Sequence, residues 1–87
     1  MFIAQQIMYY VYLLQSINYS DQRYIGYTED FNKRLIDHNS GCSHHTKQYK
    51  PWKIVMVIGF EEKLKALEFE KYLKSGSGRA FAQKRFW

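Results

Sequence analysis

The sequence predicts an α/β domain in which three extended segments are combined with helices. Residues 9–15, 23–27 and 52–60 are rich in aromatic and β-branched side chains, which favour strands. Residues 29–39 and 61–74 instead place apolar side chains at helical spacing. With 87 residues, of which 46% are hydrophobic and 18% aromatic, the chain has the length of one domain and enough apolar bulk for a packed core.

The first two strands are expected to pair as a hairpin. Tyr9 to Gln15 carries the aromatic and β-branched residues of the first strand, and Arg23 to Tyr27 carries those of its partner. The polar residues from Asn18 to Gln22 supply a turn between them. This hairpin therefore forms the start of the predicted sheet.

The N-terminus and the cysteine content bear on domain boundaries and compartment. We expect residues 1–8 to be an N-terminal extension and residues 9–87 to be a single domain; the first residue could be Met1 or Met8. The extension lacks the basic leader and long apolar run of a signal peptide, and no membrane span is predicted. Cys42 is the only cysteine, so no disulfide can form within the chain, which favours the reducing cytoplasm.

Residues 29–39 are expected to form the first helix. Thr28 can cap its start because a hydroxyl can accept a hydrogen bond from a free backbone amide. Glu29 and Asp30 complement the positive end of the helix dipole, and Gly41 is a typical helix stop.

A strand at residues 52–60 is predicted to follow a polar, basic loop at residues 42–51. Its apolar residues form a nearly continuous run, which is typical of a strand buried on both faces, so we expect it to be the central or best-protected strand. The second long helix, 61–74, begins with acids and ends with lysines, as the helix dipole favours. Serines and glycines at 75–78 are expected to end it before a short apolar helix at 79–87.

Charge is distributed unevenly along the chain. The formal net charge is +5, no acid lies between His38 and Phe60, and none follows Glu70. In both stretches basic residues alternate with aromatic ones, a composition that suits nucleic acid or an anionic surface. A basic surface also serves simply to keep a domain soluble, so charge alone does not decide between these explanations.

Glu70 occupies an unusual position for a carboxylate. The apolar arc of the second long helix comprises Ala66, Leu67, Phe69 and Leu73. Glu70 falls in the middle of this arc, where burial of an unpaired charge costs on the order of several kcal/mol. It therefore needs a cation, a hydrogen-bond network or an open cleft edge. From the residues alone, a Glu paired with Lys or Arg at the core edge and a metal site are both open.

The first helix also brings polar groups to an apolar face. Phe31, Leu35 and His38 share one face, and Arg34 lies beside them. A cleft between helix and sheet would explain two basic groups at this place. The alternative for His38 is a histidine that caps carbonyls at the end of the helix.

Two short motifs identify a family. Tyr10-Val11-Tyr12 is followed, after eleven residues, by Tyr24-Ile25-Gly26. With these motifs, residues 10–74 resemble the GIY-YIG nuclease domain, the second motif being unaltered. The resemblance implies a three-stranded antiparallel sheet flanked by helices and metal-dependent hydrolysis of DNA phosphodiester bonds. The chain is similar to small stand-alone bacterial members of the family and to the nuclease domains of excision-repair incision subunits and structure-specific resolvases. This similarity implies a role in DNA repair or recombination.

The resemblance assigns catalytic roles to Tyr12, Tyr24, Arg34, His38 and Glu70. Glu70 stands where the family binds one divalent metal ion, Mg²⁺ or Mn²⁺, and Arg34 where it holds the scissile phosphate. His38 matches a position that is histidine in many members. Tyr12 would act as the base and Tyr24 would position water or phosphate. Because a phenol at pH 7 is ionised on the order of one part in a thousand, we expect neighbouring cations to lower the pKa of Tyr12.

Other residues are expected to bind DNA or to support the backbone. The expected DNA contacts are Lys33, Lys47, Lys50, Lys74 and Arg79. Gly26 lets the backbone pass closely or turn after its strand. Thr46, Lys47, Pro51 and Trp52 match a family segment that follows the first helix.

The residues leave two alternatives open. Cys42, His44 and His45, with His38, offer zinc ligands, although their spacing is not that of a known finger. The basic, aromatic surface would also suit a non-catalytic nucleic-acid-binding module on the same fold. DNA is the expected partner, and an additional protein partner is left open.

Overall fold

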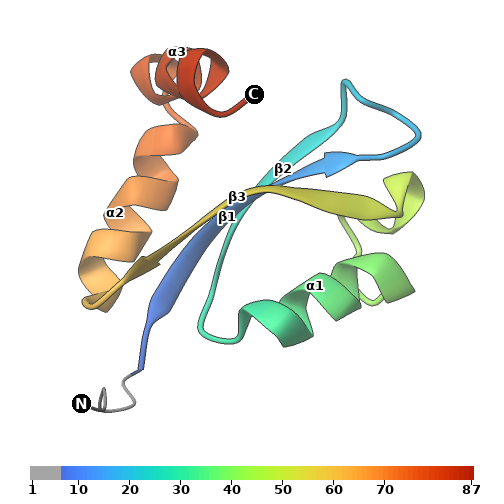
Figure 1. The fold of residues 1–87 in the computed structure, drawn as a ribbon, viewed down its shortest axis with the longest axis horizontal. Coiled ribbons are helices and arrows are strands. Elements are labelled where there is room, and N and C mark those ends of the chain that lie inside the picture. Colours follow the sequence, from blue (N-terminus) through green and yellow to red (C-terminus); the bar gives the residue numbers. More distant parts are fainter. Residues whose placement is uncertain (1–6) are drawn as a thin grey trace, which may run out of the picture.

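A computed structural model describes residues 7–87 of the chain, with helices on both faces of one sheet (Figure 1). Its elements are β1 (Tyr9–Ser16), β2 (Arg23–Thr28), α1 (Phe31–Ser40), the short 3-10 helix η1 (Lys47–Tyr49), β3 (Trp52–Phe60), α2 (Lys63–Leu73) and α3 (Gly76–Arg85). The predicted N-terminal extension, residues 1–8, lies outside the described residues except for Ile7 and Met8. None of the helices in residues 7–87 has the length and hydropathy of a membrane-spanning segment.

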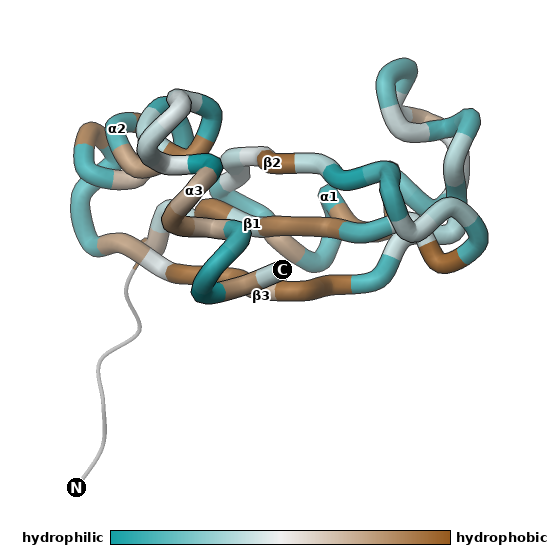
Figure 2. Tube along the Cα trace, turned by 90° about the horizontal axis from the view of Figure 1, so that it is seen from above, coloured by the Kyte–Doolittle hydropathy of each residue, from teal (hydrophilic) through white to brown (hydrophobic). Residues whose placement is uncertain are grey.

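The sheet has the order β2-β1-β3, and both pairs of strands are antiparallel (Figure 2). The predicted α/β fold with a three-stranded antiparallel sheet is therefore confirmed. The expectation that residues 52–60 form the central strand was wrong, because β1 is central and β3 is an edge strand. In β3, Ile54 is 44% exposed and Val57 is 42% exposed. β-branched residues suit a pleated surface whether or not it is buried, so composition did not report position in the sheet.

Two hydrophobic clusters lie on opposite faces of the sheet, because successive side chains of a strand point to opposite sides. The cluster beneath α2 and α3 has Val11, Leu13, Ala66, Leu73 and Ala82 as its buried residues. The cluster beneath α1 has Tyr12, Leu14 and Trp52. Figure 1 shows α1 on one side of the sheet and α2 with α3 on the other. We call these sides the α1 face and the α2–α3 face.

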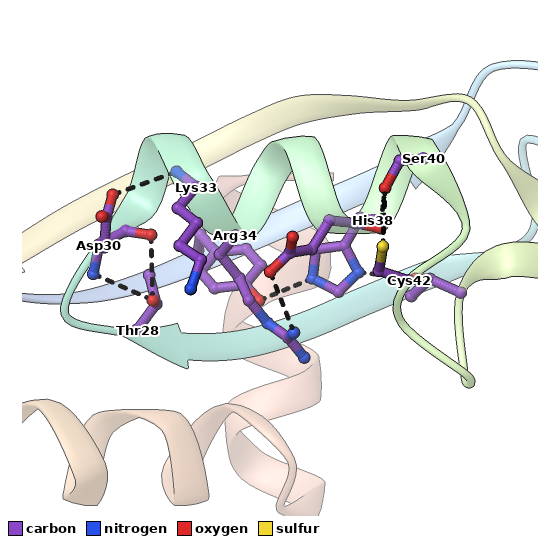
Figure 3. A network of polar contacts seen from close by, with 10 residues as sticks. Thr28, Asp30, Lys33, Arg34, His38, Ser40 and Cys42 are labelled. Atoms are coloured by element: carbon purple, nitrogen blue, oxygen red, sulfur yellow. Dashed lines mark hydrogen bonds and ion pairs between the residues drawn. The ribbon is translucent and has the colours of Figure 1, made fainter.

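The first helix begins two residues later than predicted. Its N-cap is Asp30, whose Oδ1 accepts a hydrogen bond from the backbone N–H of Lys33 at 3.1 Å. Thr28 was expected to be the cap, but its hydroxyl instead accepts from Asp30 N at 3.1 Å and donates to Asp30 O at 3.2 Å (Figure 3). Thr28 therefore closes the turn that leads from β2 into α1. Gly41 ends the helix, as predicted, with a left-handed φ of 87°.

The junction between α2 and α3 is tighter than predicted. The stretch 75–78 was expected to separate two helices, but α3 already begins at Gly76, with Ser75 as its N-cap. Ser75 Oγ accepts from the backbone N–H of Gly78 at 3.2 Å. A Cβ added at Gly78 would collide with the carbonyl oxygen of Tyr72. The glycine is therefore required for the close approach of the two helices rather than for a flexible loop.

Candidate active site

A chain of three buried side chains connects β1, α1 and the loop that follows α1. The Tyr12 Oη atom lies 2.8 Å from His38 Nε2, and His38 Nδ1 lies 2.6 Å from Thr46 Oγ1. The exposed fractions of Tyr12, His38 and Thr46 are 1%, 0% and 1%. These side chains form a polar network inside the core of the α1 face, where each hydrogen bond compensates for lost contact with water.

His38 is held in its neutral form. Burial and the positive charge of Arg34 together lower the pKa of His38 to about 4, and Asp37 opposes the change. At pH 7 the ring therefore has one N–H donor and one nitrogen acceptor, which match its two hydroxyl partners. The alternative of a histidine that caps helix carbonyls does not describe this side chain, since both ring nitrogens face hydroxyl groups.

Tyr12 is more strongly protonated than an ordinary tyrosine. Burial and the neighbouring Tyr24 raise the pKa of Tyr12 to about 12, and the contact with Arg34 only partly offsets this. Arg34 does lower the pKa of Tyr12, as expected for a neighbouring cation, but the loss of hydration outweighs the guanidinium charge and the net shift is upward. At neutral pH, Tyr12 has a proton to give, and its hydrogen-bonded partner is His38.

Arg34 and Tyr24 complete the polar group around Tyr12. The Tyr24 ring lies 6.1 Å from the Tyr12 ring and 4.8 Å from the His38 ring, measured between centroids. Burial lowers the pKa of Arg34, but contacts of its guanidinium with the Tyr12 and Tyr24 phenols outweigh burial and the pKa is raised. Arg34 Nη1 also lies 4.0 Å from Asp37 Oδ2. Four of the five residues expected to be catalytic thus lie together.

Gly26 makes room for the two phenols. In the antiparallel pair of β1 and β2, Gly26 is directly opposite Tyr12. A Cβ added at Gly26 would collide with Cζ and Oη of Tyr12 and would lie 2.8 Å from Cε2 of Tyr24. The expected close approach at Gly26 therefore involves two side chains rather than another segment of backbone.

Glu70 was expected in the middle of an apolar arc of the second long helix. In the structure it lies at the edge of the α2–α3 core. Within that arc Ala66 and Leu73 are buried, whereas Leu67 is 37% exposed. The Glu70 side chain is 22% exposed, and its Oε2 accepts a hydrogen bond from Lys74 Nζ at 3.3 Å. Its negative charge is one of the causes that raise the pKa of Tyr12. Glu70 is therefore a partly exposed carboxylate within electrostatic range of the tyrosine group.

The donor chemistry of Glu70 fits a divalent metal ion. Mg²⁺ is usually bound by one or two carboxylates together with waters and substrate phosphates, so one accessible carboxylate is sufficient on the protein side. Residues 7–87 contain no group of three or more His, Cys, Asp or Glu side chains that could hold a metal by themselves. Cys42, His44 and His45 thus do not gather into the zinc site that was left open.

An open cavity of about 450 Å³ adjoins Arg34. It is lined by Tyr27, Thr28, Glu29, Asp30, Lys33, Arg34 and Asp37. Figure 3 shows Lys33 and Arg34 extending from α1 toward the strand below it. A phosphate that enters this cavity would meet both cations, and it would also meet the three carboxylates of the lining.

The residues expected to contact DNA do not form one patch. Lys33 lines the cavity at the start of α1. Lys50 and Lys47 lie beside Gly41, at the opposite end of that helix. Lys74 follows α2, and Arg79 is part of α3 on the other face of the sheet. The basic residues therefore surround the domain on more than one side.

Sequence reasoning missed the contact between His38 and Thr46. Thr46 is eight positions from His38, in an irregular loop, and no periodic pattern relates the two. The only signal was the match of Thr46 to a family segment. The Trp52 indole, whose Nε1–H donates to the Thr46 carbonyl at 2.8 Å, holds this loop against the sheet.

Comparisons with known proteins extend over most of the chain. The family model described as "GIY-YIG catalytic domain" matches residues 8–84. The structure-specific endonuclease subunit SLX1 of Vanderwaltozyma polyspora is 41% identical over 75 residues, which are 78% of this chain and 24% of the relative. SLX1 of Malassezia globosa is 40% identical over 67 residues, 72% of this chain and 15% of the relative. The SLX1 homolog of Drosophila persimilis is 38% identical over 71 residues, with 71% and 24% covered. The chain thus spans a quarter or less of the length of these relatives.

Proposed function

Because the chain belongs to the family of GIY-YIG catalytic domains, we propose that it is a metal-dependent DNA endonuclease that hydrolyses phosphodiester bonds in DNA repair or recombination. One observation carries this proposal. The Tyr12 phenol oxygen lies 2.8 Å from the neutral His38 ring and also contacts the guanidinium of Arg34. A proton acceptor and a phosphate-binding cation are therefore neighbours of the same oxygen atom. The relatives are named structure-specific endonuclease subunits, which supports DNA as the substrate class.

Tyr12 removes the proton from the attacking water with the help of His38. Its raised pKa, about 12, disfavours a free phenolate before the reaction. The phenol oxygen therefore accepts the proton of water while its own proton moves to His38 Nε2. This transfer requires that Nδ1 carries the N–H of the neutral ring and donates it to Thr46 Oγ1. Thr46 in this proposal sets the tautomer that leaves Nε2 free to accept.

Arg34 binds the phosphoryl group and prepares His38. Its ion pair with Asp37, at 4.0 Å, is partly exposed and weak, so a phosphate oxygen can replace the carboxylate. The positive charge of Arg34 is one cause of the low pKa of His38. A phosphate bound to Arg34 neutralises that charge, which raises the proton affinity of His38 when substrate is present.

Glu70 is the residue that would hold the divalent ion, Mg²⁺ or Mn²⁺. When bound, this ion neutralises negative charge that develops on the phosphate and on the leaving oxygen. Tyr24, whose ring packs against His38, orients water or phosphate. Lys74 Nζ donates to Glu70 Oε2 in the protein alone, so Lys74 would have to release this carboxylate before Glu70 could hold an ion.

The proposal also includes the residues that contact DNA, the cellular compartment and a protein partner. Lys33, Lys47, Lys50, Lys74 and Arg79 are the basic residues that we expect to contact DNA. Cys42 is an exposed free thiol, which fits the reducing cytoplasm. The SLX1 relatives are named subunits, and a protein partner of unknown identity is accordingly part of this proposal.

The test is cleavage of plasmid, single-stranded, flapped and branched DNA with Mg²⁺ or Mn²⁺. We expect Glu70→Gln to lose cleavage and Glu68→Gln, an exposed residue of the same helix, to retain it. Calorimetric titration with Mn²⁺ should show weakened metal binding only in Glu70→Gln. Equal cleavage by native protein and Glu70→Gln would overturn the metal role. DNA binding without cleavage by the native protein would instead favour the non-catalytic binding module.

A further inference from the structure

A second groove lies on the α2–α3 face, between β2 and α3. Its volume is about 410 Å³, and its lining consists of Arg23, Ile25, Leu73, Arg79, Ala82, Gln83 and Trp87. None of the residues of the proposed catalytic group contributes to it. We call it the β2–α3 groove.

The β2–α3 groove is cationic and has an apolar floor. Two of its lining side chains are arginines, one is a glutamine, and none is acidic. Leu73 and Ala82 are buried at its base. A cavity of this size is within the range of sites that hold a small organic group. Its chemistry thus fits a ligand with an anionic part and a less polar part.

Arg23 is held in place before any ligand arrives. Its Nη1 donates a hydrogen bond to Gln83 Oε1 at 3.0 Å, and its Cζ lies 4.6 Å from the centre of the Trp87 ring. These contacts also attach the end of α3 to β2, and this structural role alone would account for an arginine at this position. They leave part of the guanidinium's five N–H donors for another acceptor.

Arg79 has no comparable structural explanation. Within residues 7–87 its guanidinium makes no ion pair with a carboxylate, and no hydrogen bond of its side chain is found. No acid follows Glu70 in the sequence, so α3 itself carries no carboxylate side chain that could pair with Arg79. An arginine that lines a groove beside a second, immobilised arginine is suited to a phosphate oxygen.

The position of the groove relates it to the candidate active site. Arg23 and Thr28 are the two ends of β2, about 17 Å apart at the usual rise of a strand. Arg23 is at the groove, whereas Thr28 lines the cavity beside Arg34. Because β2 is an edge strand, a polymer can run along its open side from one face to the other. In duplex DNA this distance corresponds to about five nucleotides of one strand.

We propose that the β2–α3 groove binds a phosphate and its attached nucleoside about five nucleotides from the bond that is cleaved. The proposal rests on the proposed nuclease function and names a second contact for the same DNA. Arg79 and Arg23 bind the phosphate, and the floor formed by Leu73 and Ala82 receives the sugar or an unpaired base. Such a contact selects substrates whose DNA extends along β2 beyond the cleavage position.

The experiment compares two charge-matched variants, Arg79→Gln and Arg85→Gln. Both residues are exposed and belong to α3, but only Arg79 lines the groove. Fluorescence anisotropy with a labelled branched DNA, in EDTA so that no metal-dependent cleavage occurs, gives the dissociation constant over a range of salt concentrations. We expect Arg79→Gln to raise this constant roughly three- to tenfold and to reduce the salt slope by about one, as for a lost phosphate contact. Arg85→Gln should change the constant less than about twofold.

A direct signal from the groove accompanies the affinity measurement. In NMR titrations with the same DNA, the indole N–H of Trp87 and the side-chain amide of Gln83 should shift in the native protein and in Arg85→Gln. They should shift much less in Arg79→Gln, whose melting temperature should equal that of the native protein. Native affinity in Arg79→Gln, or an equal loss of affinity in both variants, would overturn the proposal.

The two proposals can fail separately. If the native protein does not cleave DNA but its binding depends on Arg79 and not on Arg85, the groove is a DNA contact, and the nuclease proposal fails together with the distance to a cleaved bond. If the native protein cleaves DNA and Arg79→Gln binds it with native affinity, only the groove proposal fails.

Discussion

The two faces of the sheet are built from the same strand but stabilised in different ways. Along β1, Val11 and Leu13 enter a purely apolar cluster on the α2–α3 face. Their neighbour Tyr12 enters the α1 face, where His38 and Thr46 are also buried. Adjacent positions of one strand therefore have different tasks, and the pleat of the strand separates them.

The difference shows how a small domain accommodates polar chemistry in its core. In residues 7–87 no buried side-chain nitrogen or oxygen atom lacks a hydrogen-bond partner. A satisfied polar network fixes the geometry of its members, whereas an apolar cluster contributes stability through buried area. Substitutions in the buried polar network of the α1 face should mainly change activity, and substitutions in the buried apolar cluster of the α2–α3 face should mainly change stability.

The strongest contrast is expected between two glycines. In Gly26→Ala the new Cβ would collide with Tyr12 and displace the phenols, so we expect at least a roughly hundredfold loss of cleavage rate. In Gly78→Ala the new Cβ would collide with the Tyr72 carbonyl and separate α2 from α3, which should destabilise the fold by about 1–3 kcal/mol or more. Cleavage rates and urea unfolding curves measure both effects. A Gly26→Ala variant with the native rate would contradict the tight packing of the phenols.

The next effect is a pH dependence of stability caused by His38. Its pKa is about 4 in the folded protein, below the ordinary 6.5. Between these values the unfolded chain binds a proton that the folded protein excludes, so acidification favours unfolding. The stability present above pH 6.5 should fall by on the order of 3 kcal/mol as the pH approaches 4. Urea unfolding at pH 7 and pH 4.5 should show this fall in the native protein and in the exposed control His44→Gln. The fall should be much smaller in His38→Gln; an unchanged fall in that variant would contradict the assignment.

A smaller effect is expected from the hydroxyl of Thr46. Thr46→Val keeps the shape of the side chain but removes the partner of His38 Nδ1, which should lower kcat about tenfold with little change in KM. Thr46→Ser restores the hydroxyl and should recover most of the rate. Nitrogen NMR of the imidazole should show the proton on Nδ1 in the native protein and in Thr46→Ser, and a mixture of tautomers in Thr46→Val. Equal rates in the two variants would exclude Thr46 as a positioning residue.

Local features of the fold were predictable from the sequence, and the family is confirmed. The strands, the hairpin and the glycine stop at Gly41 follow from residues close together in the chain. The order of strands depends on contacts across the whole domain, and for this reason the β-branched segment 52–60 was placed incorrectly in the centre. The helix start was displaced because Thr28 and Asp30 are both capable caps, and only the geometry of the turn decides between them.

The candidate site was predictable as a set of residues but not as an arrangement. The motifs indicated Tyr12 and His38, yet their hydrogen bond joins positions 26 residues apart. The direction of the pKa shift of Tyr12 could not be inferred from nearby cations, because burial dominates it. Glu70 was placed within the apolar arc by helical spacing, whereas Glu70 lies partly exposed at the edge of the α2–α3 core. The catalytic roles of these residues stay predictions until variants are assayed.

The most direct test of the contrast between the faces compares Tyr12→Phe with Leu13→Ala. Both side chains are almost fully buried, with exposed fractions of 1% and 0%, and they are neighbours in β1. Cleavage of branched DNA and thermal melting are measured for each. We predict that Tyr12→Phe, which leaves His38 Nε2 without its hydrogen-bond partner, loses about 1–3 kcal/mol of stability and loses cleavage by about a hundredfold or more. Leu13→Ala should lose about 2–5 kcal/mol of stability and cleave at the native rate below its melting temperature. Native cleavage by Tyr12→Phe would contradict the account of the α1 face.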